Sequence, residues 1–332
     1  MRRVAVPALA APPDAPAAGA RVATLVGETM GTTWTVRVAA PPDIDFVALR
    51  ARIQHALDRV VAQMSTYRPD SDLSRFNAAP AGTWLALPEE FLAVLTAALA
   101  LARETDGAFD PTVGPLVDLW GFGPAGRRTE PPPAAAIEAV AGPVGWARLE
   151  IDAARRRARQ PGGVRLDLSA IAKGFGVDAV ADCLRDAGLT CYLVEVGGEL
   201  RGAGTKPDGK PWWVAPDRPR ADMPETIVAL HGLAVATSGD YRRFFDSGGI
   251  RYAHTIDPRT GRPVSHGLVA VTVLHPSCMQ ADALATALTV LGPQAGYDFA
   301  CARGIAALFV ARDGGGDRLP ETMTPAFLAM LD

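Results

Sequence analysis

The sequence predicts an α+β fold in which antiparallel or mixed sheets are flanked by helices. Short segments that alternate apolar and polar residues are separated by turn sequences, as expected for hairpins. Longer segments with helical spacing are interspersed among them without a regular strand-helix alternation. The 332 residues are 48% apolar and 21% charged, which supplies enough apolar surface for a large core.

The first ordered element is expected near residue 23. Residues 1–22 are rich in alanine and proline and are predicted to be a flexible leader, which leaves 23–332 as one domain. Alternation predicts a strand over 32–38, and helical spacing predicts helices over 46–64 and from 87 to about 105. A short helix is expected at about 135–140.

A strand-helix-strand unit is predicted over 163–168, 169–187 and 190–196. Ser169 can cap the helix and Gly188 can end it. Further strands are expected in the second half of the chain, at 212–214, 227–231, 233–237, 252–256, 268–274 and 305–310. A helix that carries Asp282 is expected between the last two of these strands.

Composition argues against several classes of protein. The net charge of -3 argues against a nucleic-acid-binding protein, which typically carries an excess of basic residues. No apolar run in the sequence is long enough to span a membrane. The glycines at 121–126 match G-x-G-x-x-G, but no strand precedes them and no helix follows, which excludes a dinucleotide-binding fingerprint. The four cysteines fit no zinc pattern and are interpreted as small core residues.

Asp282 and Thr286 form the most informative pair, because they are four residues apart in a predicted buried helix. Positions i and i+4 share one face of a helix. A carboxylate and a hydroxyl on an otherwise apolar face suit Mg²⁺, which binds oxygen ligands and keeps positions for water and phosphate. The alternative is a solvated aspartate beside a threonine bonded back to its own helix.

Small residues follow Asp167 at the start of the predicted helix 169–187, and Lys173 adds a positive charge there. A helix N-terminus with close backbone access favours a phosphate. Ordinary helix packing with a surface lysine is the alternative.

His254 ends a predicted strand beside Asp257, where it can act as a general base or serve a structural role. The rigid loop around Phe109 and Asp110, and the phenol of Tyr67, can flank a flat ring, or Phe109 can pack in the core.

Eight segments in order along the chain resemble motifs of the ApbE family of flavin transferases. They are 27–32 (Gly-Glu-Thr-Met-Gly-Thr), 64–77, 109–116, 167–174, 196–198, 237–241, 254–261 (His-Thr-Ile-Asp-Pro-Arg-Thr-Gly) and 281–286 (Ala-Asp-Ala-Leu-Ala-Thr). The resemblance implies a T-fold-like domain that uses FAD and Mg²⁺, attaches FMN to a threonine of an acceptor protein and releases AMP.

The resemblance also implies roles for individual residues. It makes Asp282, Thr286 and the backbone carbonyl at Ala170 metal ligands, and His254 the base. The implied contacts with the flavin nucleotide are Met30, Tyr67, Ala108, Phe109, Asp110, Asp167, Lys173 and Ile256. Two positions depart from some members, since Ala285 replaces an acidic ligand and Lys173 stands where a glutamate is found.

Two other functions remain open on the sequence. A Mg²⁺-dependent FAD pyrophosphatase would use the same site with water in place of threonine, and a flavin carrier would hold FAD without cleaving it. Family members commonly act outside the cytoplasm, whereas the N-terminal segment is a poor export signal, so the sequence leaves the compartment undecided.

Overall fold

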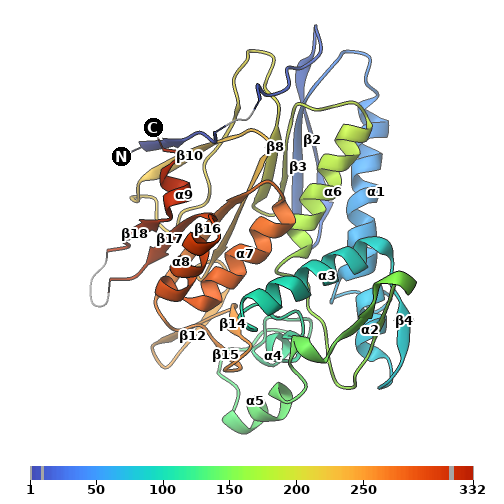
Figure 1. The fold of residues 1–332 in the computed structure, drawn as a ribbon, viewed down its shortest axis with the longest axis vertical. Helices are drawn as coiled ribbons and strands as arrows, with labels where there is room; N and C mark the ends of the chain where they lie inside the picture. Colours follow the sequence, from blue (N-terminus) through green and yellow to red (C-terminus); the bar gives the residue numbers. More distant parts are fainter. Residues whose placement is uncertain (1, 9–10, 314–317, 332) are drawn as a thin grey trace.

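A computed structural model describes residues 2–8, 11–313 and 318–331. Within these residues, eight strands form one central sheet in which every neighbouring pair is antiparallel (Figure 1). In spatial order the strands are β18 (Glu321–Met323), β17 (Ala306–Ala311), β16 (Leu268–His275), β11 (Leu233–Gly239), β8 (Glu199–Ala203), β7 (Tyr192–Val196), β3 (Thr32–Ala40) and β2 (Arg21–Thr29).

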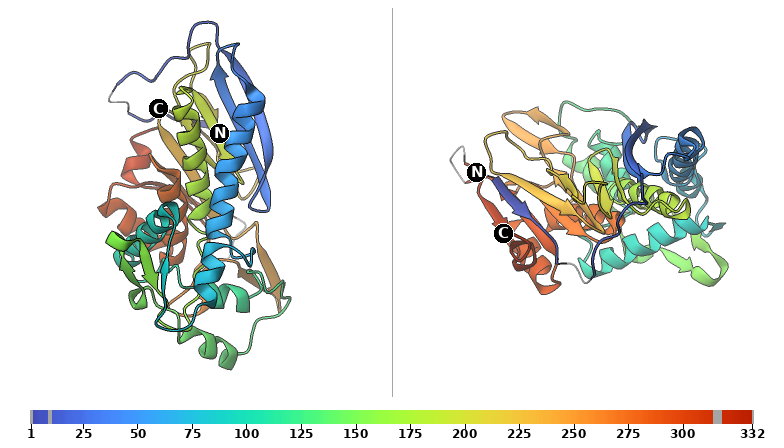
Figure 2. Two further views of the ribbon diagram at one scale, coloured as in Figure 1. Left: turned by 90° about the vertical axis from the view of Figure 1, so that its right-hand side faces the viewer. Right: turned by 90° about the horizontal axis from the view of Figure 1, so that it is seen from above.

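Helices cover one face of this sheet, and α1 and α6 run side by side along it (Figure 2). The helices of the described residues are α1 (Phe46–Met64), α2 (Asp72–Ala78), α3 (Glu89–Glu104), α4 (Gly114–Leu119), α5 (Ala134–Ala141), α6 (Ala172–Asp186), α7 (Cys278–Leu291), α8 (Pro293–Ala302) and α9 (Pro325–Leu328). Of these, α9 packs on the opposite face of the sheet. Two 3-10 turns lie at Trp146–Arg148 and Ala153–Arg155.

The opposite face packs against a smaller sheet, in the order β1 (Arg2–Ala5), β10 (Glu225–Leu230) and β9 (Trp212–Val214). Successive residues of a strand point to opposite faces of the sheet and therefore pack in different hydrophobic cores. In β7, Val194 packs with α1 and α6 on one face, whereas Leu193 packs with Trp212 and Leu230 on the other. Both faces are buried at β16, where all residues but the last are buried, and this explains the continuous apolar run of that strand.

Three further small sheets lie around the lower part of the molecule as drawn in Figure 1. One contains β4 (Trp84–Ala86), β6 (Arg157–Arg159) and β5 (Glu150–Asp152), and the others are the hairpins β12 (Phe244–Ser247)–β13 (Ile250–Ala253) and β14 (Ile256–Asp257)–β15 (Arg262–Pro263). The predicted strand 252–256 is thus divided between two hairpins.

Part of the segment predicted to be a flexible leader is a strand. β1 pairs in parallel with β10, and its residue Ala5 is fully buried. The Val6 N–H also donates to the Met330 carbonyl over 2.7 Å, which brings the two ends of the chain together. These partners are more than 200 residues away, so local composition does not reveal the strand.

The predicted strand-helix-strand unit lacks its first strand. Residues 163–168 form no strand: Gly163 is a bend with a left-handed φ of 74°, and Arg165 makes a single β-bridge with Val113. The Asp167 N–H donates to the Pro111 carbonyl, and the side chain of Asn77 in α2 bonds both backbone groups of Leu166. Ser169 does not cap the helix either, because α6 begins at Ala172 after a turn in which Asp167 accepts from the Ser169 N–H.

Among the described residues, no helix combines the length and apolar character that crossing a bilayer requires. The cysteines are all free, and Cys191 and Cys278 are buried, as expected for small core residues. Residues 121–126 form a loop after α4 rather than a nucleotide-binding turn.

Candidate active site

A cavity of about 330 Å³ lies where the N-terminal part of α6, one face of α7, the turn between β7 and β8 and the segment before β14 meet. It is lined by most of the residues that the sequence singled out: Ala108, Phe109, Asp110, Asp167, Ala170, Lys173, His254, Ile256, Asp282 and Thr286. Segments that are far apart in the chain therefore meet at one cavity.

Met30 and Tyr67 do not line this cavity. Met30 occupies the tight β2–β3 turn in a left-handed conformation (φ 50°) and reaches α6 near Gly176. Tyr67 is 58% exposed, and its hydroxyl donates to the carbonyl of Phe122, a residue of the cavity wall, over 3.3 Å. Both remain predicted contacts beside the cavity.

Asp282 of α7 lines the cavity and caps the N-terminus of α6. Its Oδ2 accepts from the Gly174 N–H over 3.0 Å, which satisfies one of the unpaired amides in the first turn of α6. The close approach requires glycine, since a Cβ at Gly174 would clash with the Cys278 carbonyl oxygen and lie 2.8 Å from the Cβ of Asp282. Oδ1 of Asp282 has no hydrogen-bond partner among the described residues.

Three charged groups share this buried space: Asp282, Lys173 and Glu199. Lys173 Nζ lies 2.6 Å from Glu199 Oε1. Burial, followed by the charge of Asp282, raises the pKa of Glu199 to about 7, and burial also raises the pKa of Asp282. Burial alone would lower the pKa of Lys173, but the two carboxylates outweigh it and raise that pKa.

The oxygen atoms around Asp282 fit a small hard cation. Thr286 lies one turn further along the same face of α7, with its hydroxyl 3.0 Å from that of Ser238, and Ala170 lines the same cavity. Glu199 Oε2 is buried without a hydrogen-bond partner among the described residues. In the same residues no group of three or more His, Cys, Asp or Glu side chains is placed to hold a metal ion. Mg²⁺ commonly keeps several waters and binds phosphate oxygens beside one or two protein carboxylates.

His254 lies between β13 and β14, and its Nδ1 is 3.2 Å from the carbonyl oxygen of Arg243. Because a carbonyl only accepts, this contact places the proton on Nδ1 and leaves Nε2 as an acceptor. Burial, with the nearby charge of Arg243, lowers the pKa of His254 to about 4. The imidazole is therefore neutral at pH 7, as a proton acceptor must be.

Asp110 is already engaged by its own loop. Oδ1 accepts from the amide and hydroxyl of Thr112, and Oδ2 accepts from the Trp146 N–H over 3.0 Å. Burial raises its pKa despite these bonds. Its carboxylate shapes the rigid wall that also carries Phe109.

Several residues of the cavity were missed in the sequence. The motif 196–198 was recognised in the sequence, but Glu199, which directly follows its glycine turn, was not. Its role becomes visible only in the structure, where it is buried against Lys173. Arg242 and Arg243, just after the 237–241 motif, also line the cavity, and Arg242 forms an ion pair with Asp217. Two arginines in a row after a glycine-containing turn were a usable signal for an anionic ligand.

Comparisons with known proteins agree with this geometry. The sequence model described as the ApbE family matches residues 30–309. A Vibrio cholerae protein named FAD:protein FMN transferase is 43% identical over 295 residues, covering 88% of each chain, and an Escherichia coli K12 protein of the same name is 36% identical, covering 93% of this chain and 89% of its own.

Solved structures are similar over nearly the whole length. The apo form of the Pseudomonas stutzeri flavinyl transferase ApbE superposes with a TM-score of 0.87 at 43% identity, covering 94% of this chain and 97% of its own. The flavin transferase ApbE from Vibrio cholerae gives a TM-score of 0.85 at 40% identity, covering 94% and 99%. The range matched by the family model, 30–309, includes every residue that lines the cavity.

Proposed function

This chain belongs to the ApbE family, and from that premise we propose how it works as an FAD:protein FMN transferase: it uses Mg²⁺ and attaches FMN to a threonine of its acceptor protein. The observation that carries the proposal is the shared cavity of Asp282, Thr286, Ala170, Lys173 and His254. Oxygen ligands for a metal on α7, the Lys173 ammonium near the start of α6 and a neutral imidazole all favour phosphoryl transfer.

The reaction is a substitution at phosphorus. The hydroxyl oxygen of the acceptor threonine bonds the phosphorus of the FMN half, the bond from that phosphorus to the bridging oxygen breaks, and AMP leaves with the bonding electrons. Threonine is a weak nucleophile, so its proton passes to Nε2 of His254. The neutral state of His254 at pH 7 supports this role.

Asp282, Thr286 and the carbonyl of Ala170 would hold the cation. Mg²⁺ bound there supplies charge neutralisation for the pyrophosphate and polarises the phosphorus. Lys173, Arg242 and Arg243 bring further positive charge to the cavity and favour the anionic substrate. Ala108, Phe109 and Ile256 form an apolar wall that suits the isoalloxazine ring.

The proposal is tested by incubating the protein with FAD and candidate flavoprotein subunits, with Mg²⁺ or with EDTA, followed by intact-protein mass spectrometry. We expect the acceptor to gain the mass of one FMN in the samples with Mg²⁺ and not in those with EDTA, and we expect the label to map to a threonine. Release of FMN and AMP without labelling would identify a pyrophosphatase, and intact FAD after long incubation would identify a carrier. Either result contradicts the proposal.

Asp282→Asn tests the metal site in the same assay. The amide oxygen of asparagine can still accept from the Gly174 N–H, whereas the negative charge toward the cation is lost. We expect transfer to fall by about 10²-fold or more, with a higher Mg²⁺ requirement. Asp298→Asn, on the exposed face of α8, is the control and should leave both unchanged. Full Mg²⁺-dependent transfer by Asp282→Asn would remove the metal role.

A further inference from the structure

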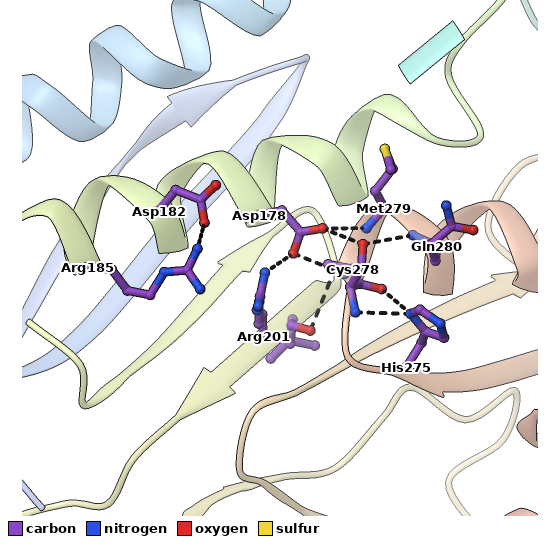
Figure 3. A network of polar contacts seen from close by, with 10 residues as sticks. Asp178, Asp182, Arg185, Arg201, His275, Cys278, Met279 and Gln280 are labelled. Atoms are coloured by element: carbon purple, nitrogen blue, oxygen red, sulfur yellow. Dashed lines mark hydrogen bonds and ion pairs between the residues drawn. The ribbon is translucent and has the colours of Figure 1, made fainter. Parts of the chain in front are cut away.

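A second aspartate, outside the cavity, holds the start of the helix that carries Asp282 and Thr286. Asp178 of α6 accepts from the Cys278 N–H, the Met279 N–H and the Ser277 hydroxyl over 3.0, 3.0 and 2.7 Å (Figure 3). The Ser277 hydroxyl in turn accepts from the Gln280 N–H over 3.3 Å. The unpaired amides in the first turn of α7 are thereby satisfied.

The contact is reciprocal, because each helix caps the other. Asp178 of α6 caps α7 at 277–279, and Asp282 of α7 caps α6 at Gly174. The two contacts are four residues apart on each helix, which means that α6 and α7 overlap antiparallel by their first turns. One turn is about 5.4 Å, so Asp178 controls the position of α7 a single turn away from the metal-binding face.

Strand β8 adds a third element to this arrangement. Arg201 Nη1 lies 2.5 Å from Asp178 Oδ1, and both side chains are largely buried. Glu199 precedes Arg201 by two residues, so the two side chains leave the same face of β8. Two polar layers therefore join α6 and β8: Lys173 with Glu199 inside the cavity, and Asp178 with Arg201 behind it.

We infer that Asp178 is a positioning residue for the transfer: it fixes the register and rotation of α7 and so holds Asp282 and Thr286 toward the cavity. The inference rests on the proposed function, since it assigns a purpose to the placement of those two oxygens. Asp178 itself does not line the cavity, and it acts through the backbone of residues 277–279.

The experiment compares Asp178→Ala with Asp182→Ala in the full-length protein. Asp182 lies one turn along the same helix, and its ion pair among the described residues is with Arg185 at the surface, which makes it a matched control (Figure 3). Activity is measured well below the unfolding temperature of each variant. We expect Asp178→Ala to need about tenfold more Mg²⁺ for half-maximal transfer and to have a lower kcat. Asp182→Ala should match the wild type.

A second readout is independent of catalysis. Cys278 opens α7, is fully buried and has the N–H that Asp178 accepts, so its thiol reports on the anchoring of α7. We expect a maleimide to label Cys278 faster in Asp178→Ala than in the wild type or Asp182→Ala, as mapped by peptide mass spectrometry. Asp178→Asn keeps one acceptor oxygen and should be intermediate in both readouts, and it replaces Asp178→Ala if that variant is insoluble.

The outcomes separate the two claims. Faster labelling with unchanged Mg²⁺ requirement and kcat would make Asp178 a purely structural cap and overturn the inference. Unchanged labelling would overturn it as well. A wild-type protein that transfers no FMN under any Mg²⁺ concentration would instead refute the proposed function, and a fully active Asp178→Ala beside an active wild type would refute only the positioning role.

Discussion

His254 is the residue whose protonation state matters most to the proposed chemistry. It is neutral because its site is desolvated and adjoins Arg243, and its Nδ1 is tied to a backbone carbonyl. A base with so low a pKa takes a proton well only as the phosphorus–oxygen bond forms and the hydroxyl becomes acidic. Orientation of Nε2 therefore matters as much as basicity.

Replacement of His254 by asparagine should lower kcat for FMN transfer by about 10²–10⁴-fold, because the proton acceptor is lost. FAD affinity should change little, since the cationic and apolar parts of the cavity remain. Steady-state transfer kinetics and FAD titration separate the two quantities. His55→Asn, at an exposed position on α1, should behave like the wild type. A His254→Asn enzyme with normal kcat would exclude the base assignment.

The same histidine makes the stability of the FAD-free protein depend on pH. Its pKa is about 4 in the folded protein and about 6.5 in an unfolded chain, so the unfolded state takes up the proton first as pH falls. The stabilisation is present above pH 6.5 and is lost between pH 6.5 and 4. Melting temperatures between pH 7.5 and 4.5 should fall less in His254→Asn than in the wild type. Parallel curves would contradict the lowered pKa.

Some residues of the site and its surroundings could be predicted from the sequence, and others could not. Asp282 and Thr286 were predictable because helix geometry alone places positions i and i+4 on one face. Glu199 and Asp178 were not, because their importance comes from partners on other elements: Lys173 in one case and residues 277–279 in the other. A charge beside a glycine turn or inside a helix carries no local sign of such pairing.

Among the elements, every predicted helix is present, although α2, α4, α8 and α9 were not predicted, whereas one predicted strand is absent. The helix 46–64 was predicted with its bounds because Leu49, Ile53, Leu57 and Val60 recur at helical spacing and are all buried. The strand at 163–168 was wrong because an extended segment becomes a strand only if another strand pairs with it. Here the pairing is a single bridge between Arg165 and Val113, and Asn77 and the Pro111 carbonyl bond the backbone groups of Leu166 and Asp167.

The crossing of α6 and α7 depends on Gly174, and Gly174→Ala tests it. The added Cβ would meet backbone atoms of α7 that cannot swing aside, so the helices must separate. We expect a loss of about 1–3 kcal/mol in the free energy of unfolding. Transfer should fall further than this loss explains, because the Gly174 N–H and Asp282 move apart.

Chemical denaturation and transfer kinetics measure these two effects separately. Gly142→Ala is the control, since Gly142 has helical backbone angles and no neighbouring atom within 4 Å of an added Cβ. It should retain both stability and activity. Equal behaviour of the two variants would show that the helices tolerate a wider crossing and would weaken the link between their packing and the metal face.

For the whole molecule, the site and the joined ends of the chain belong to different parts of the fold. The cavity is built by α6, α7, β11 and the segments near β14, whereas β1 and α9 pack over the far face of the central sheet with β10 (Figure 1). The α+β class was predictable from the mixture of hairpins and helices. The parallel pairing of β1 with β10 was not, because no local pattern specifies a partner so distant in the chain.

This separation predicts that the end of the chain contributes to stability without affecting catalysis. Ala5→Asp would bury an unpaired carboxylate beneath the small sheet, and we expect the free energy of unfolding to fall by several kcal/mol. Val6→Asp is the adjacent control, because Val6 is 37% exposed and its new charge would be solvated. We expect the melting temperature to fall strongly for Ala5→Asp alone, while kcat at low temperature stays at the wild-type value. That result would show that β1 stabilises the fold without acting on the site. A fall in kcat without a fall in melting temperature would instead connect β1 to the site through the central sheet.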